Sequence, residues 1–185
     1  MSAKKQVTRQ NIIDGAYALV KRGGMSALNA RSLAKSLGCS TRPIYISFTS
    51  MEELKAEVVK LITQTYQTYL KNEVDRNIYP EYKAYGMGYI RFAKEQRHLF
   101  SYLFMRSRES QQEYDGGDMS GVLSSLSAAT GLGGDLAERF HWECWTFVHG
   151  IASMFATGYL TFDEETVSTL ISDVFLGLKL RYENL

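Results

Sequence analysis

Three residues between positions 41 and 46 carry side chains that can read the edges of base pairs. Arg42 has a planar guanidinium that can donate two parallel hydrogen bonds to the O6 and N7 acceptors of guanine. Thr41 can reach either a base or a phosphate, and Ile46 can contact the methyl group of thymine. These residue types in one short segment predict a surface that contacts DNA, provided that local structure points them outward.

The first element needed to position them is a short helix that follows Asn29. The Asn29 side chain suits the N-cap position, and Ala30, Leu33 and Leu37 recur at helical spacing to form an inward face. Gly38 then permits a sharp turn, because glycine adopts backbone conformations that other residues avoid. This pattern predicts the first helix of a helix-turn-helix.

A second short helix is expected to start at Ser40, whose side chain suits an N-cap. Ile44 and Phe48 lie four residues apart and would pack against the first helix. Pro43 falls in the first turn, where its missing N–H has no intrahelical partner, so it marks a start of the helix. An alternative for Tyr45 is a core aromatic side chain wedged between helices. The remaining residues are predicted to face outward: Thr41, Arg42, Tyr45 and Ile46.

Charge is distributed unevenly along the chain. Residues 1–50 contain eight basic side chains and one acidic side chain, a net charge of +7, whereas residues 51–185 contain 13 basic and 19 acidic side chains, or −6. A basic segment beside an acidic remainder is expected where one end of a protein meets phosphate, although a basic segment can also be a solvated helix face. Lys4, Lys5 and Arg31 would add salt-dependent attraction to DNA.

Helical patterns continue through the rest of the chain. A helix from Thr8 to Lys21 completes a three-helix head, and Ser50 with Glu53 fits a capping box that starts a long helix. Further helices are expected after Pro80, over 97–105, 119–130, 135–158 and 164–182, with a loop over 106–118. We therefore predict an all-α fold of about nine helices, with a head over 1–50 and a helical body over 51–185.

Composition argues against β-rich, disulfide-stabilised and membrane-spanning proteins. The 185 residues are 45% hydrophobic, contain two prolines and show no alternating pattern typical of strands. Two cysteines do not make a disulfide framework, and no segment approaches the roughly 18 apolar residues of a membrane span. We expect a reducing, cytoplasmic setting and no membrane insertion.

The order of these motifs resembles the TetR family of transcriptional repressors. The residues that carry the resemblance lie between positions 8 and 54 and include Leu33-Ala34, Leu37-Gly38, Ser40, Ile44-Tyr45, Phe48, Ser50 and Glu53-Leu54. The body resembles one ligand-binding subtype of that family through Trp145 followed by His149-Gly150, and through RHLFSYLFM over 97–105.

The resemblance implies a homodimer whose two heads enter successive major grooves of double-stranded, palindromic operator DNA. It also implies that a small molecule enters the body and releases the DNA. Tyr45 is similar to a phosphate-binding tyrosine of the family, and the helix N-termini at Asn29 and Ser50 offer N–H groups to phosphates. Ser47 and Met51 stand where many relatives have histidine and lysine. An alternative is therefore a ligand-binding or interaction protein that has lost DNA binding.

Two residue sets are expected in the body. A pocket for an apolar or aromatic effector is expected to be lined by residues that could instead be core, namely Tyr85, Tyr89, Phe92, Phe104, Trp142, Trp145 and His149. The resemblance implies a dimer bundle formed by the last two helices, to which we assign Ile151, Met154, Phe155, Leu170, Val174, Phe175 and Leu178.

Enzymatic and metal-binding alternatives have weak support. The sequence lacks a P-loop, a nucleophile elbow and an HExxH motif. A metal site could draw on His141, Glu143, Cys144 and His149, but neighbours on one helix point in different directions and no CxxC or HxxxH spacing is present. We expect no enzyme activity, no metal and no cofactor.

Overall fold

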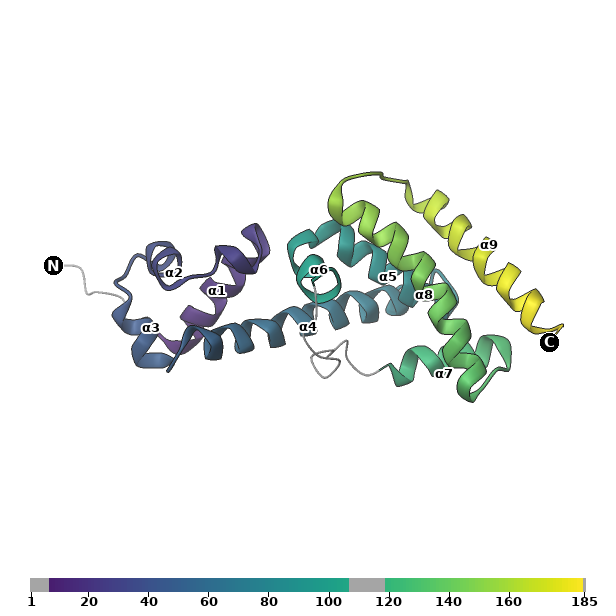
Figure 1. Cartoon of the computed structure of the whole chain (residues 1–185), viewed down its shortest axis with the longest axis horizontal. Coiled ribbons are helices and arrows are strands. Elements are labelled where there is room, and N and C mark those ends of the chain that lie inside the picture. Colours follow the sequence, from purple (N-terminus) through teal and green to yellow (C-terminus); the bar gives the residue numbers. More distant parts are fainter. Residues whose placement is uncertain (1–6, 107–118, 185) are drawn as a thin grey trace.

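A computed structural model describes residues 7–106 and 119–184. Over those residues the chain forms nine α-helices and one 3₁₀ turn, with no strand, which confirms the predicted all-α class. Figure 1 shows a small head (α1 to α3) and a larger body (α5 to α9) joined by the long helix α4. The elements are α1 (Arg9–Gly23), η1 (Met25–Ala27), α2 (Ala30–Leu37), α3 (Arg42–Ser47), α4 (Met51–Asp75), α5 (Glu81–Glu95), α6 (Arg97–Phe104), α7 (Ser120–Thr130), α8 (Gly134–Thr157) and α9 (Glu164–Tyr182).

The head forms because each helix has a defined beginning and one apolar side. Thr8 caps α1 in a reciprocal capping box with Asn11, and the Asn29 side chain accepts hydrogen bonds from the backbone N–H groups of Arg31 and Ser32 at the start of α2. Gly38 ends α2 in the left-handed conformation, at φ +64°, which allows the sharp turn. The helices enclose a core made of Ile12, Ala16, Val20, Leu33, Ile44 and Phe48.

The second helix of the motif begins one residue later than predicted. Thr41, and not Ser40, occupies the N-cap position of α3, and no side chain forms a capping hydrogen bond there. Pro43 lies in the first turn, as its lack of an N–H requires. Packing of Ile44 and Phe48 against the head, rather than a cap, therefore holds this six-residue helix in place.

The long helix α4 begins with half of the predicted capping box. Ser50 accepts a hydrogen bond from the Glu53 N–H, but the Glu53 carboxylate accepts from the N–H and hydroxyl of Thr49, not from Ser50. These two bonds, led by the backbone N–H of Thr49, lower the pKa of Glu53. Leu54 and Val58 are buried in the first turns of α4, where the helix packs on α1. The same helix therefore contributes to the head and to the body.

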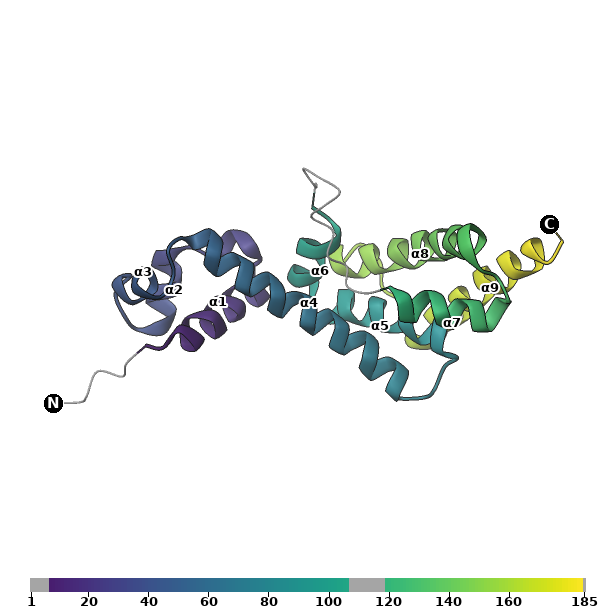
Figure 2. The same ribbon diagram turned by 90° about the horizontal axis from the view of Figure 1, so that it is seen from below.

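In the body, α5 is the central helix and packs against α4, α6, α7, α8 and α9. Gly88 brings α5 close to α4, since an added Cβ would lie 3.0 Å from the Tyr69 carbonyl oxygen. Figure 1 shows α9 at the edge of the body with α8 beside it, and in the view of Figure 2 α7 lies in front of α9. Helices α8 and α9 match the predicted helices over 135–158 and 164–182. None of the described helices is long and apolar enough to span a lipid bilayer.

A buried carboxylate links three helices of the body. Glu73 on α4 is only 2% exposed and accepts hydrogen bonds from Arg76 at 2.8 Å and from Arg91 of α5 at 2.9 Å. Arg91 also donates to Glu164, at the start of α9, at 3.2 Å. A buried charge is stable only when it is paired, so this network fixes the C-terminal end of α4 against α5 and α9.

Candidate nucleic-acid interface and ligand pocket

The outer surface of the head is formed by the side of α3 that faces away from its core. Tyr45 is 55% exposed and Ile46 is 74% exposed, while Ile44, the residue before Tyr45, is buried. Arg42 is exposed and Thr41 is half-buried. The alternative in which Tyr45 is wedged into the core is therefore wrong. The structure instead brings a guanidinium, a phenol hydroxyl and an apolar side chain together on one short helix.

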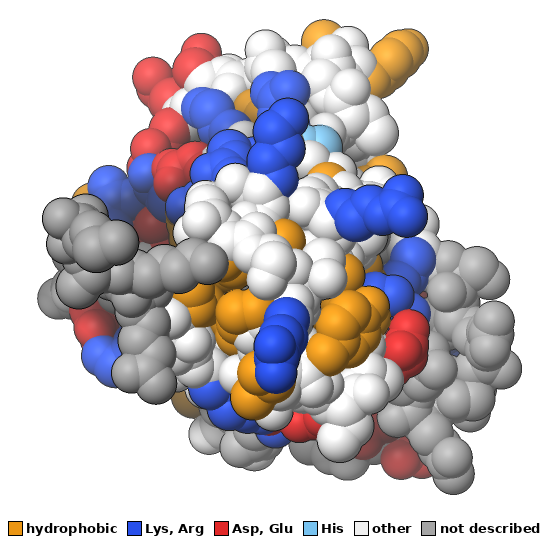
Figure 3. Space-filling model, turned by 90° about the vertical axis from the view of Figure 1, so that its left-hand side faces the viewer, with side chains coloured by type: hydrophobic (Ala, Val, Ile, Leu, Met, Phe, Trp, Pro, Cys, Tyr) orange, Lys and Arg blue, Asp and Glu red, His pale blue; other side chains and the backbone are white. Residues whose placement is uncertain are grey.

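Basic residues are also exposed elsewhere on the head. Arg31 and Lys35 are exposed on α2. Figure 3 looks onto the head end of the molecule and shows Lys and Arg side chains among exposed hydrophobic ones, with acidic side chains toward the margins. Lys4 and Lys5 lie outside the described residues, as does most of the predicted loop over 106–118. The charge asymmetry of the sequence therefore has a counterpart on this surface.

Not every basic residue of the head is available to a ligand. The Arg9 guanidinium lies 3.5 Å from both Glu53 and Glu57 on α4, and 4.5 Å above the centre of the Phe48 ring. Arg9 therefore holds α1 to the start of α4. The helix N-termini at Asn29 and Ser50 are likewise partly occupied, because those side chains already accept from the first backbone N–H groups.

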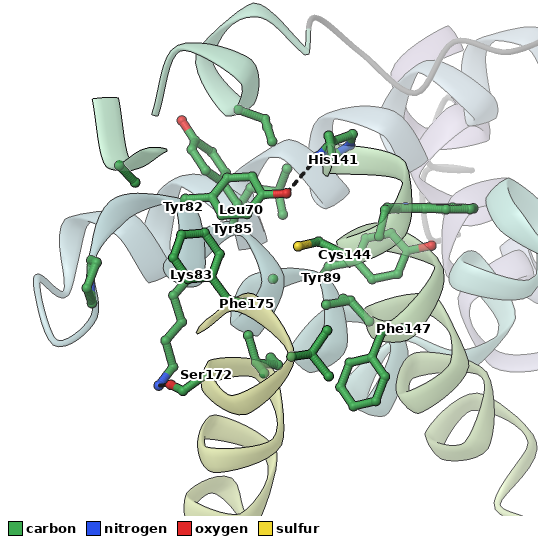
Figure 4. Close-up of a pocket in the computed structure, with 18 of the residues that line it drawn as sticks. Leu70, Tyr82, Lys83, Tyr85, Tyr89, His141, Cys144, Phe147, Ser172 and Phe175 are labelled. Carbon is green, nitrogen blue, oxygen red and sulfur yellow. Dashed lines mark hydrogen bonds between the residues drawn. The ribbon is translucent and has the colours of Figure 1, made fainter. Parts of the chain in front are cut away.

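The body contains a cavity of about 310 Å³ between α5, α7, α8 and α9, with α4 at its edge. Figure 4 shows side chains from these helices converging on it. The lining residues are Tyr66, Leu70, Pro80, Tyr82, Lys83, Tyr85, Gly86, Tyr89, Met119, Val122, Ala129, His141, Cys144, Trp145, Phe147, Val148, Ile171, Ser172, Val174, Phe175 and Leu176. A mostly apolar wall with a few polar groups is the usual composition of a small-molecule site.

The polar groups of the wall are held by hydrogen bonds between helices. The Tyr82 hydroxyl lies 3.0 Å from Nδ1 of His141, as Figure 4 shows, and the Tyr89 hydroxyl lies 2.8 Å from Nδ1 of His149. Burial lowers the pKa of both histidines, which favours the neutral imidazole. Burial also raises the pKa of the Cys144 thiol to about 11. These side chains therefore offer neutral hydrogen-bonding groups at neutral pH.

The predicted pocket residues divide into two groups. Tyr85, Tyr89 and Trp145 line the cavity. The other four lie elsewhere, because they fill the core, support the wall or face solvent. Phe92 is fully buried, Phe104 packs on Tyr66 and Tyr89, and Trp142 is exposed. His149 stacks on the Trp145 ring at 4.7 Å, behind the cavity wall.

Sequence reasoning missed several lining residues, including Tyr82, Lys83 and Phe147. Val174 and Phe175, which were predicted at the dimer interface, also line the cavity. Phe175 is held there by contacts with the rings of Tyr82 and Phe140. The signal that could have identified Lys83 is its position, a cation directly after Tyr82 at the start of the aromatic stripe of α5.

The predicted dimer face also needs correction. Ile151 and Phe155 are buried inside the single chain, because they belong to its main hydrophobic core. Met154, Leu170 and Leu178 are half-buried. The large apolar side chains of α9 that are most exposed are Leu176, at 60%, which also borders the cavity, and Leu180, at 64%. These two residues lie one helical turn apart, so they share one face of the helix.

Three of the four residues considered for a metal have other partners. Glu143 lies 3.4 Å from Arg139 and 3.6 Å from Arg181, and the two histidines bond to tyrosines. Among the described residues, no three His, Cys, Asp or Glu side chains are grouped in a way that could hold a metal ion.

Comparison with known proteins agrees with this arrangement. A family model described as "Bacterial regulatory proteins, tetR family" matches residues 12–58, from α1 into α4. A second model, described as "Tetracyclin repressor-like, C-terminal domain", matches residues 82–174, from α5 into α9. No curated protein matches the chain significantly. The first match contains the exposed face of α3, and the second contains most of the cavity wall.

Proposed function

The chain belongs to the TetR family of bacterial transcriptional regulators, and from that premise we propose that it is a repressor. In this proposal a homodimer binds a palindromic operator through its two heads and leaves it when a small molecule enters the body. The observation that carries the proposal is the outer face of α3, where Arg42, Tyr45 and Ile46 are exposed around a buried Ile44. A regulator of transcription acts at the chromosome, so we place it in the cytoplasm, and we propose no enzymatic activity.

The proposed DNA contacts follow from side-chain chemistry. Arg42 reads guanine, Ile46 contacts a thymine methyl, and Tyr45 donates its hydroxyl to a phosphate. Thr41 contacts a base or a phosphate, and Arg31 adds electrostatic attraction to the backbone. We also assign backbone contacts to the residues at or near helix starts, and to the N-terminal lysines, namely Asn29, Ser40, Ser50, Lys4 and Lys5.

The dimer is proposed to form through the outward faces of α8 and α9. Leu176 and Leu180 are exposed apolar residues on α9, and Trp142 is exposed on α8. Gly150 and Gly177 face open space, since an added Cβ at either position would have no neighbour within 4 Å. Small residues on such a face allow the helices of a second copy to approach closely. Association would remove these apolar side chains from water.

The division into a head of residues 1–50 and a body of residues 51–185 stays a prediction. α4 begins at that boundary, and Leu54 and Val58 of α4 are buried where the helix packs on α1. We infer that the head functions as a unit with the first turns of α4. Movement of α4 in the body would then be transmitted directly to the head.

The alternative is a ligand-binding or interaction protein that has lost DNA binding. It is motivated by Ser47 and Met51, which supply neither of the two phosphate contacts that histidine and lysine would provide. The exposed guanidinium and phenol on α3 favour the repressor, because a head kept only as a scaffold would not need them.

An electrophoretic mobility shift assay distinguishes the repressor from the alternative. It uses a pool of random-sequence DNA duplexes and is run from low to physiological salt. The repressor should bind at low salt and lose affinity steeply as salt rises, because bound phosphates release counterions. Arg31→Gln should make this dependence on salt shallower. Lys60→Gln is the matched control, since Lys60 is an exposed lysine farther along α4. Absence of salt-sensitive binding at low salt would favour the alternative.

A further inference from the structure

The only formal charge in the described lining of the body cavity is positive. Among the described residues that line it, Lys83 is the one side chain with a formal charge at neutral pH, and none is Asp or Glu. Tyr82, Tyr89 and His141 contribute neutral polar groups to the lining, since burial lowers the pKa of the His141 imidazole. The cavity therefore combines apolar walls with a single cation.

Lys83 is held at the edge of this cavity without an opposite charge. Its ammonium donates to the hydroxyls of Ser168 at 2.7 Å and Ser172 at 2.8 Å, one turn apart on α9, and lies 5.0 Å from the centre of the Tyr79 ring. In the part of the chain that the structure describes, no carboxylate forms an ion pair with it. Two of its three N–H donors are thus used by neutral acceptors.

Two acidic side chains of the body, by contrast, lie beside opposite charges. Glu73 is paired with two arginines, and Glu164 is paired with the same two. Removing a cation from water without a compensating anion costs free energy, and burial lowers the pKa of Lys83 accordingly. An anion from outside the chain would relieve this cost while the apolar walls enclose the rest of the molecule.

We propose that the cavity binds an amphiphilic organic anion, with an apolar or aromatic body against the walls and one acidic group paired with the Lys83 ammonium. This inference rests on the proposed function, in which the cavity is the effector site. A cavity of about 310 Å³ lies at the small end of the roughly 300 to 1,000 Å³ range of ligand pockets, so the anion is a compact one. Neutral or cationic analogues of the same shape would lack the charged contact.

Two fluorescent probes with the same ring system test the role of charge. The anionic probe is 8-anilinonaphthalene-1-sulfonate, and the neutral probe is N-phenyl-1-naphthylamine, which lacks the sulfonate. Both should bind the wild-type protein and accept energy from Trp145, which lines the cavity. In Lys83→Met the affinity for the anionic probe should fall by about tenfold or more, because a hydrogen-bonded charge contact is lost. The neutral probe should be affected by less than about twofold, and Lys83→Arg should retain the anionic probe.

Two control variants locate the binding event. Lys60→Met removes an equivalent charge from the surface of α4 and should leave both affinities unchanged. Gly86→Leu should weaken both probes, because its Cβ would already contact Val148 at 3.6 Å and the remaining side-chain atoms would enter the cavity.

The outcomes separate this inference from the proposed function. If neither probe binds the wild type, the cavity is not a ligand site and both ideas fail. If both bind and Lys83→Met leaves the anionic probe unchanged, the cavity remains a ligand site but its preference for anions is wrong. If Lys83→Met does not fold, the test uses the wild-type protein and a second pair of ligands. The anion 1-naphthylacetate should bind about tenfold or more tightly than the neutral 1-naphthylacetamide. Equal affinities would overturn the inference.

Discussion

The head carries its proposed functional residues on its outer surface, whereas the body carries them around an internal cavity. In the head, a closed core around Leu33, Ile44 and Phe48 pushes Arg42 and Tyr45 into solvent. In the body, the helices enclose a cavity, and the polar groups point inward and bond between helices. A rigid outer surface suits DNA, whose shape is fixed, whereas an internal space suits a small molecule that must be surrounded.

The head and the body are connected through α4 and through contacts of α1 with α4 and α6. α4 runs from the head into the body, and Tyr17 of α1 is hydrogen bonded to Thr65 of α4 at 2.8 Å. The short helix α6 also packs on α1, and His98 of α6 lies 3.7 Å from the position of a Cβ added to Gly24. Movement of α4 or α6 in response to a ligand would therefore shift the head.

The largest expected effect comes from breaking the dimer. Leu176→Glu combined with Leu180→Glu should give monomers in sedimentation, because two charges would be buried in the proposed interface. Operator affinity should fall by about 100-fold or more, because the second head no longer binds as part of the same molecule. Ile78→Glu, at an equally exposed residue between α4 and α5, should stay dimeric. A dimer that persists in the double variant would place the interface elsewhere.

A smaller effect is expected from the buried network of the body. Glu73→Gln removes the carboxylate that both Arg76 and Arg91 contact, and should lower the free energy of unfolding by about 2 to 3 kcal/mol, since both arginines keep access to water. Chemical denaturation measures this change. The matched substitution Glu52→Gln, at an exposed carboxylate on α4, should change stability by less than about 0.5 kcal/mol. Equal effects of the two substitutions would contradict a structural role for the network.

A cap in the head should matter less than the network in the body. Ser50→Ala removes the hydroxyl that accepts the Glu53 N–H and should cost about 1 kcal/mol. Ser50→Asp should restore most of that loss. Hydrogen exchange would show faster opening of the first turn of α4, with the body unchanged. An unchanged first turn in Ser50→Ala would leave the Thr49–Glu53 bonds as the main stabilising contacts.

The smallest expected effect is a dependence of stability on pH that is present in the body and absent from the head. Burial lowers the pKa of His141 and His149 below about 6.5, so the unfolded chain binds protons that the folded body does not. Stability from these groups is present above that pH and declines as pH falls below it. Unfolding of the body should therefore be easier at pH 5.5 than at pH 7.5, with the described part of the head unaffected, since it contains no histidine. Substituting both histidines with Gln should remove the dependence, whereas exposed His98→Gln should not.

The sequence allowed the head to be predicted more closely than the body. Helical spacing assigns Ile44 inward and Arg42 outward with little help from tertiary structure, because α3 packs on one small core. Small errors arose where alternatives lie one residue apart, such as Ser40 for Thr41 at the cap and Ser50 for Thr49 as the partner of Glu53.

The pocket could not be predicted in the same way, since several helices surround it. Phe92 and Tyr89 lie on the same helix and are both buried, yet of the two only Tyr89 lines the cavity. The choice depends on how α5 is rotated against α4 and α8, which no local pattern specifies. The same holds for α9, whose apolar residues divide between the cavity at Phe175 and the outward face at Leu180.

Selection of bound duplexes from a random pool tests the central claim of a dimeric reader of DNA most directly. The wild type should enrich a two-fold symmetric sequence with half-sites about 34 Å, or a multiple of that, apart. Arg42→Ala should relax the preference at one base pair in each half-site, equivalent to about 1 to 3 kcal/mol of discrimination. Lys60→Ala should select the same sequence as the wild type. No enrichment, or enrichment of a single asymmetric site, would contradict the claim.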